Sequence, residues 1–268
     1  MSASEILAVA TSSSSELERV IAEHLLMSGV GRPSAGEARS WSRSLPAFAR
    51  DLRDAGLGDV EVLLEHRLPL TSRRADAIVA GTDAKSGAPR YLVVELKQWG
   101  SATTATDAPN LVTVPGASYP VALHPALQVQ SYVEYLEDFL PGLAPGNLAG
   151  AKIEGIAYLH NATRASAEQL WDHESTRHHR IFTGDRRGEL VDYLKSTFAP
   201  SSGRSAADAL LSSSVAPSKQ LLALAAAEVR DREQFVLLDE QRIAYDLVLR
   251  AVDRARRQDS KSVVVITG

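Results

Sequence analysis

The sequence predicts an α/β protein in which a mixed sheet is flanked by helices. Three short runs rich in valine, isoleucine and leucine are bounded by glycine, proline or charged residues, as strands are; they lie at 60–68, 75–80 and 90–97. Longer segments with apolar residues at helical spacing precede and follow these runs. With 268 residues, of which 44% are hydrophobic, the chain can bury a full core and form one or two domains.

The first part of the chain is expected to form two helices before the three strands. Ser15 is a suitable N-cap for a helix at 16–27. A second helix begins near Ala35 and carries Trp41 and further apolar residues at helical spacing. The segment 81–89 reads as the turn that joins the second and third strands.

The middle of the chain is expected to contain a long loop, a helix and two more strands. Residues 100–119 are polar and aperiodic, which is typical of a functional or mobile loop. Pro125 suits the first turn of a helix that runs to about Leu140. Strands are expected at 153–159 and 180–183. Asp185 is then expected to cap a helix at 188–198.

A second unit is expected after residue 198. Residues 199–216 are rich in serine and alanine and read either as a linker or as a packing helix. Helices at 217–229 and 239–257 and a strand at 262–267 follow by the same periodicity. We therefore expect two units, 1–198 and 199–268.

Composition and charge exclude several classes of function. Cysteine is absent, so there is no disulfide framework, thiolate metal site or cysteine nucleophile. The net charge of −4 provides no overall basic field for nucleic acid, although Arg73-Arg74 and residues 177–187 form local basic patches. The alternative interpretation is that these patches are ordinary solvent-exposed surface. No stretch approaches the length of a membrane span and no leader is recognisable, so a cytoplasmic protein without membrane contact is expected.

Glu95-Leu96-Lys97, at the end of the third apolar run, is the most informative feature of the chain. Alternate residues of a strand project from the same face, so Glu95 and Lys97 lie on one side of the sheet. Asp76 lies in the preceding run, which predicts two carboxylates and a lysine at one place. The same acid-x-Lys pattern also occurs at 83–85, in a turn, and at 259–261, in a polar connection. The alternative for Glu95-Leu96-Lys97 is an edge strand that ends in a solvated salt bridge.

This set of residues has the chemistry that phosphodiester hydrolysis requires. Mg²⁺ prefers oxygen ligands and keeps several waters, so Asp76 and Glu95 suffice as its ligands, with the Leu96 carbonyl as a further oxygen. Lys97 is suited to orient a water or to stabilise charge in the transition state. Gln128 and Tyr132 fall on one face of the helix that begins at Pro125; taken alone, they read as an ordinary helix surface.

The order of these motifs resembles that of a known nuclease superfamily. Ala75-Asp76, Glu95-Leu96-Lys97 and the helix Gln128-Val129-Gln130-Ser131-Tyr132 are similar to the PD-(D/E)XK superfamily, and the Gln-x-x-x-Tyr helix resembles its RecB-like branch. Alanine stands where proline is usual. The resemblance implies a restriction-endonuclease-like fold, Mg²⁺ or Mn²⁺ on the acids, and a lysine that assists the water. It also implies that Gln128 and Tyr132 lie near the DNA backbone. Arg73 and Arg74, as a local basic patch, are predicted to bind nucleic acid as well.

The same resemblance implies a further glutamate from an early helix. Glu37 is the expected additional metal ligand, and Glu23 and Glu65 are weaker candidates. The alternative for Glu37 is an acid that is favoured at a helix start by the macrodipole.

The end of the chain resembles the beginning of a helicase domain. Val263-Val264-Val265-Ile266-Thr267-Gly268 is similar to the strand that leads into a phosphate-binding loop, and Leu238-Asp239-Glu240-Gln241 resembles an adenine-reading motif. With Pro217-Ser218-Lys219, these residues are similar to bacterial Schlafen-group helicases of superfamily one. The resemblance implies that 199–268 is a linker and an incomplete P-loop domain, without Walker A, in which Gln241 would contact nucleotide. A helicase region in cis is then the expected partner. The alternative is a plain terminal strand.

The expected function is Mg²⁺- or Mn²⁺-dependent cleavage of DNA, with RNA as an open alternative. The resemblance implies 5′-phosphate and 3′-hydroxyl ends and a role in DNA repair or in defence against phage. One rival is a nuclease-fold module that binds nucleic acid or regulates a helicase without cutting. Another is an unrelated α/β domain with a chance motif, which predicts that the Asp76 and Glu95 carboxylates are more than about 6 Å apart.

Overall fold

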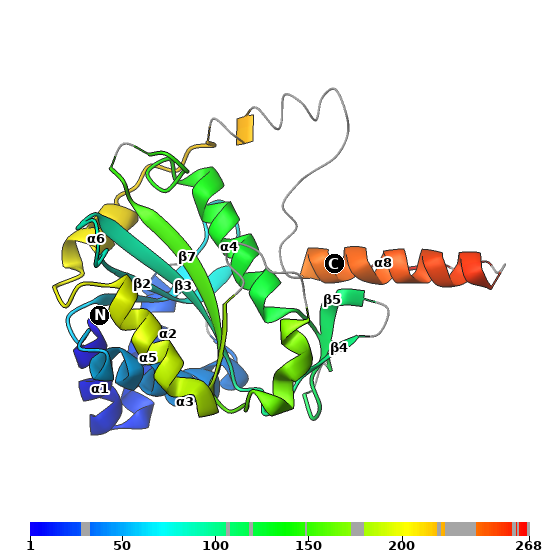
Figure 1. Ribbon diagram of the computed structural model, residues 1–268, viewed down its shortest axis with the longest axis horizontal. Helices are drawn as coiled ribbons and strands as arrows, with labels where there is room; N and C mark the ends of the chain where they lie inside the picture. The colour runs from blue at the N-terminus through cyan, green and yellow to red at the C-terminus, as the bar shows by residue number, and fades with distance from the viewer. Residues whose placement is uncertain are drawn as a thin grey trace.

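The computed structural model describes residues 1–27, 33–105, 108–117, 120–147, 149–172, 180–218, 221–222, 240–258, 261 and 263–266 (Figure 1). Within these ranges, only the backbone is described at Ser14, Ala35, Glu37 and Arg39.

Five strands form one mixed sheet in the order β1-β2-β3-β7-β8. The first three pair antiparallel, whereas β7 runs parallel to both β3 and β8. The predicted α/β class and its mixed sheet are therefore confirmed, and each strand lies within two residues of its expected bounds. The strands are β1 (Glu61–Arg67), β2 (Arg74–Thr82), β3 (Pro89–Lys97), β7 (Lys152–Leu159) and β8 (Ile181–Thr183).

Helices cover both faces of this sheet (Figure 1). Val93 of β3 is buried with residues of α4 and α6, whereas its neighbour Val94 is buried with residues of α1, α2, α3 and α5. A strand that is covered on both faces needs apolar residues at nearly every position, which explains the continuous apolar run in β3. The helices are α1 (Ala3–Ser12), α2 (Ser14–Met27), α3 (Ala35–Asp54), α4 (Pro125–Phe139), α5 (Arg187–Thr197) and α6 (Arg204–Leu211).

A three-stranded antiparallel sheet replaces the long loop that was expected at 100–119. Its strands are β4 (Thr103–Ala105), β5 (Ala108–Thr113) and β6 (Val121–Leu123), in the order β4-β5-β6. The expectation of a loop was wrong because these strands are too short to show a clear period of two. They are stabilised by burial of Leu111, Val112 and Leu123, which depends on their tertiary neighbours.

Two details at helix starts also differ from expectation. Helix α1 was not predicted, yet Ser2 and Glu5 form a capping box at its start. Asp185 does not cap α5, which has no side-chain cap. Its carboxylate instead accepts hydrogen bonds from the Arg164 amide at 2.9 Å and the Thr183 hydroxyl at 2.7 Å. It thereby ties the short 3₁₀ helix η2 (Gly184–Arg186) to the residue before η1 (Ala165–Trp171).

The segment after residue 198 begins with a packing helix. Ala206, Ala207 and Leu210 of α6 are buried in the same core as α4, and the Tyr91 hydroxyl donates to the Ala206 carbonyl at 2.9 Å. The packed unit therefore extends to α6, while a domain boundary near 198 stays a prediction. The helix expected at 217–229 lies largely outside the described residues.

One long helix, α8 (Glu240–Arg257), is described near the end of the chain, as predicted. The strand expected at 262–267 is wrong for its described part, because residues 263–266 form no strand. A strand requires a neighbouring ladder, and Val263 here is 88% exposed. None of the described helices is long and apolar enough to cross a bilayer.

Candidate functional site

Three acidic residues lie near one another at one end of the sheet, on strands β1, β2 and β3. Ala77 of β2 pairs with Val94 of β3, and Asp76 and Glu95 are the next residues along their strands, just beyond this last paired position. On the other side of β2, Glu65 lies between the two β1 residues that pair with Ala77 and Ala75. The register thus brings together acids that are 11 to 30 positions apart in the sequence.

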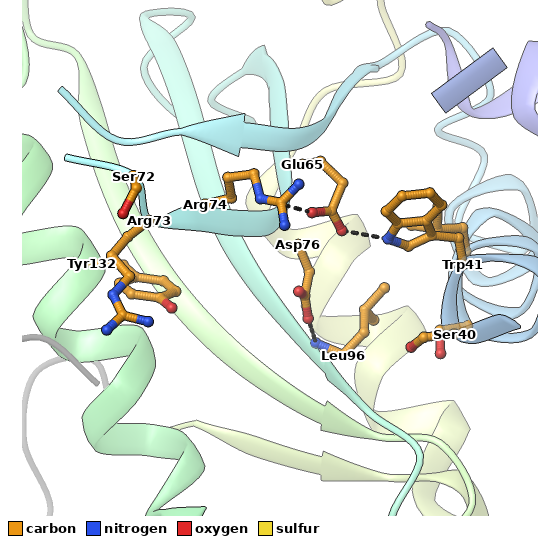
Figure 2. Close-up of a pocket in the computed structure, with 11 residues that line it drawn as sticks. Ser40, Trp41, Glu65, Ser72, Arg73, Arg74, Asp76, Leu96 and Tyr132 are labelled. Carbon is orange, nitrogen blue, oxygen red and sulfur yellow. Dashed lines mark hydrogen bonds and ion pairs between the residues drawn. The ribbon is translucent and has the colours of Figure 1, made fainter. Parts of the chain in front are cut away.

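Glu65 and Asp76 line a pocket of about 240 Å³ at one end of the sheet (Figure 2), whereas Glu95, Lys97 and Gln128 are not among its lining residues. Side chains from both helical layers and from three strands meet there. The lining residues are Ser40, Trp41, Ser44 and Leu45 of α3, Glu65 of β1, Ser72 and Arg73 of the connection, Arg74 and Asp76 of β2, Leu96 of β3 and Tyr132 of α4.

Asp76 is held against the end of β3 by a hydrogen bond. The backbone amide of Leu96 donates to its Oδ2 atom at 2.8 Å, as Figure 2 shows. A carboxylate that accepts a backbone N–H is fixed in orientation and stabilised in its charged form. The predicted acid on β2 therefore has a defined place beside Glu95-Leu96-Lys97.

Lys97 links the end of β3 to helix α4. Its ammonium group donates to Glu95 Oε1 at 2.7 Å and to Gln128 Oε1 at 2.9 Å. The Gln128 amide in turn donates to the Tyr132 hydroxyl at 3.1 Å. Glu95 is only 4% exposed, and a carboxylate buried to this degree requires compensating partners. Four of the five residues predicted to be catalytic, Glu95, Lys97, Gln128 and Tyr132, thus form one hydrogen-bonded series. The fifth, Asp76, is linked to this series only through the backbone amide of Leu96.

Two arginines supply positive charge to the same pocket. Arg74 Nε lies 3.5 Å from Glu65 Oε2, and the indole nitrogen of Trp41 donates to Glu65 Oε1 at 2.5 Å (Figure 2). Arg73 forms an ion pair with Glu240 of α8. The basic pair predicted to bind nucleic acid therefore lines the pocket that Asp76 and Leu96 border.

A network of polar side chains forms the wall on the α3 side. Gln98 donates to the Ser40 carbonyl at 3.0 Å and to Ser44 Oγ at 3.1 Å. Ser44 Oγ lies 2.9 Å from His160 Nε2. Burial lowers the pKa of His160, which favours its neutral form. This network ties α3 to the residue that follows Lys97.

Sequence reasoning missed much of this α3 wall. Trp41, Ser40 and Ser44 are spaced so that one helix face can present them, but helical spacing alone does not tell a pocket wall from a core face. Glu65 was a weaker candidate than Glu37, yet Glu65 lines the pocket, while the side chain of Glu37 lies outside the described residues. Two other candidates are not among the lining residues: Glu23 pairs with Arg19 on the surface of α2, and Gln241 lies in the first turn of α8, next to Glu240.

The donor atoms suit a hard cation better than zinc. Within the described part of the chain, no group of three or more histidine, aspartate, glutamate or cysteine residues is arranged to hold an ion. Asp76 and Glu95 nevertheless offer carboxylates from two paired strands, and Asp76 lies against the Leu96 amide. Mg²⁺ binds through one or two carboxylates and retains several waters, whereas structural zinc sites take four protein ligands. The oxygen donors of Asp76 and Glu95 are of the kind that Mg²⁺ or Mn²⁺ takes, so these ions stay a prediction.

Comparison with known proteins adds no further constraint. No family model matches the chain, and neither a curated protein nor a solved structure does so. The roles of the site residues therefore rest on the geometry of the pocket and on the resemblance of its motifs.

Proposed function

We propose that this chain is a metal-dependent nuclease that hydrolyses phosphodiester bonds of DNA. The observation that carries the proposal is the hydrogen-bonded series Glu95–Lys97–Gln128–Tyr132 beside Asp76. Helix α3, strands β1 to β3, helix α4 and strand β7 follow one another in chain order around this site. This order supports a restriction-endonuclease-like core of the PD-(D/E)XK type.

Each residue then has a role that its surroundings support. Asp76, Glu95 and the Leu96 carbonyl would hold Mg²⁺ or Mn²⁺, which when bound supplies an activated water and stabilises charge on the leaving oxygen. Lys97, held by Glu95 and Gln128, would orient that water, and these two contacts support the role.

The substrate is positioned by other residues of the pocket. Arg73 and Arg74 would bind phosphate oxygens, for which a guanidinium group has a matching geometry. Tyr132 closes the α4 side of the pocket and, through Gln128, keeps Lys97 in place.

One observation favours a non-cleaving or regulated module as the second candidate. Arg73, which lines the pocket, is paired with the carboxylate of Glu240 on α8. An acid at this position competes with a phosphate group for the same cation. The chain would then bind nucleic acid weakly until α8 moved, in keeping with a role attached to a helicase region in cis.

A cleavage assay with paired lysine variants tests the proposal. The purified chain is incubated with end-labelled single- and double-stranded DNA and RNA, with Mg²⁺, Mn²⁺ or EDTA. We expect cleavage only with metal, and a loss of about 10²- to 10⁴-fold in Lys97→Ala, the range typical of a positioned acid–base group.

Lys85 is the matched control, because Asp83-Ala84-Lys85 has the same acid-x-Lys pattern and Lys85 is exposed. Lys85→Ala should retain full activity. The enzymatic proposal fails if no metal supports cleavage of any substrate and if Asp76→Ala leaves Mn²⁺ binding, measured by calorimetry, unchanged. Retained nucleic-acid binding in that case would support the non-cleaving module.

A further inference from the structure

Glu65 has a backbone conformation that is unfavourable for glutamate. Its φ angle is 50°, and among the described residues other than glycine only Leu70, with φ 56°, is also positive. This left-handed region is adopted readily by glycine and tolerated by asparagine, but it brings the Cβ of other residues close to the backbone. Strained residues of this kind cluster at functional sites, where surrounding contacts hold them.

The Glu65 side chain is also in an environment that is unfavourable for a charge. It is 8% exposed, and its two carboxylate oxygens face different partners. Oε1 accepts from the Trp41 indole at 2.5 Å, and Oε2 lies 3.5 Å from Arg74 Nε (Figure 2). Glu65 thereby joins α3, β1 and β2 at the pocket.

Arg74, the cation that Glu65 contacts, is placed next to the proposed catalytic acids. Arg74 and Asp76 are two residues apart in β2, so both project from the same face of the strand. Both line the pocket, with Glu65 beside Arg74 and Leu96 beside Asp76. A phosphate group that approaches Asp76 therefore comes within the reach of the Arg74 side chain.

We propose that Glu65 is a positioning residue that orients the Arg74 guanidinium toward a phosphate group of a bound nucleic-acid strand. The proposal rests on the proposed function, because it assigns the phosphate subsite of the same pocket. A carboxylate at Nε sets the plane of the guanidinium, and a planar group in a set orientation loses less entropy when it binds phosphate. Trp41 fixes the carboxylate in turn.

The direction in which affinity changes when Glu65 is removed distinguishes a positioning role from a purely electrostatic one. Glu65 is an acid in a pocket proposed to bind a polyanion. If it had no positioning role, its removal would reduce repulsion and tighten binding. If it orients Arg74, its removal weakens binding in spite of the lost negative charge.

Two glycine substitutions form a matched pair for the test. Glu65→Gly and Leu70→Gly relieve the same backbone strain, but Leu70 is 79% exposed and is not among the pocket residues. The probe is a fluorescein-labelled single-stranded oligothymidylate, and its binding to the 268-residue chain is followed by anisotropy without divalent metal. Urea unfolding of each variant reports its stability.

We expect Glu65→Gly to weaken oligonucleotide binding by about tenfold, the usual effect of losing one charge-assisted hydrogen bond. Leu70→Gly should bind as the wild type does, with an unchanged or higher urea midpoint. Glu65→Gln, which keeps an oxygen acceptor, should lose less affinity than Glu65→Gly. Arg74→Gln should weaken binding about as much as Glu65→Gly, and the double variant should be no weaker than either.

Several outcomes would overturn the inference. Unchanged or tighter binding by Glu65→Gly would show that Glu65 does not orient a phosphate contact. Loss of Mn²⁺ binding in this variant would make Glu65 a metal ligand instead. Should Glu65→Gly not fold, Glu65→Asn, which tolerates the left-handed backbone, is measured in its place. A wild-type chain that binds no oligonucleotide would contradict the proposed function itself, whereas wild-type binding without an effect at Glu65 overturns only this inference.

Discussion

Charged side chains at the pocket are arranged as neighbouring opposite charges. Glu95 lies against Lys97, and Glu65 lies against Arg74. Both carboxylates are almost fully buried, and a buried carboxylate is stabilised when a cation and hydrogen bonds replace its hydration. The same pairing keeps each cation oriented. At the residue scale, the groups proposed to do chemistry are therefore also groups that keep this end of the sheet folded.

A histidine on β1 makes stability depend on pH. Burial, and secondarily the nearby charge of His24, lowers the pKa of His66 from 6.5 to about 4. Between these values the unfolded chain binds the proton and the folded chain does not, so stability falls as pH decreases through this window. We expect the free energy of unfolding, measured with urea near pH 7 and near pH 5, to fall by about 2 kcal/mol through this group.

His66→Leu should remove that part of the pH dependence, because leucine has no ionisable group. The largely apolar pocket around this position should accommodate the leucine side chain. His24→Gln removes only the secondary cause and should flatten the curve much less. An identical pH dependence in the wild type and in His66→Leu would contradict the assignment.

At the scale of elements, the position of α4 depends on a close approach to β7. A Cβ at Gly155 would overlap Val129 of α4 and lie 3.1 Å from Val133 Cγ2. Val129 immediately follows Gln128, which contacts Lys97. The missing side chain at Gly155 therefore sets the distance between α4 and the sheet, and with it the reach of Gln128 to the lysine.

Gly155→Ala should force α4 away from the sheet and lower the free energy of unfolding by about 1–3 kcal/mol, as overpacking does. Val129→Ala in the same chain should restore part of that loss. Gly188→Ala, where the added Cβ meets nothing within 4 Å, serves as the control and should be neutral or stabilising. Urea unfolding measures the free energy of unfolding of each variant. If the losses of the two single variants simply add in the double variant, the added Cβ at Gly155 does not act by overlapping Val129.

At the scale of the whole molecule, α8 reaches the pocket through the small three-stranded sheet. Ile243 packs against the apolar cluster around Leu111 of β5, and Asn110 donates to Asp246 at 3.3 Å. These contacts hold the first turns of α8 beside the sheet, while the rest of the helix extends away from the body (Figure 1). Glu240 is thereby held where it pairs with Arg73.

We expect Glu240→Gln to tighten binding of single-stranded DNA by roughly three- to tenfold, because the competing carboxylate becomes neutral. Asp253→Asn, an equal change of charge on an exposed part of α8, should have a smaller effect. In an Arg73→Gln background the gain from Glu240→Gln should disappear. Anisotropy at one fixed salt concentration measures the wild type and the four variants, and equal gains from Glu240→Gln and Asp253→Asn would indicate a general charge effect.

Periodicity and motif order were enough to predict the sheet strands and most of its helices. The apolar runs around Val93 and Ile156 are local patterns, and Glu95-Leu96-Lys97 was identified because a strand places alternate residues on one face. Asp76 followed as the acid of the neighbouring run. The spacing of Gln128 and Tyr132 on a helix is also a local property, so the residues of the hydrogen-bonded series around Lys97 were named in advance, whereas Trp99, whose ring lies 5.1 Å from the Lys97 ammonium, was not named as a site residue.

The remaining features depended on contacts between distant segments. The strands around Leu111 exist because they bury apolar residues against neighbours, and no period of two marks them in the sequence. The run from Val263 to Ile266 has strong strand propensity but no neighbouring ladder, and it forms no strand.

The sequence by itself determined which residues are proposed to carry the chemistry, because residue type and local periodicity are properties of the chain alone. Only the tertiary structure decided what surrounds them: Glu65 between Trp41 and Arg74, and Glu240 on Arg73. These pairs join segments at least 9 and as many as 167 positions apart. Packing, and not spacing, determines whether such groups meet, because burial and charge pairing act through space.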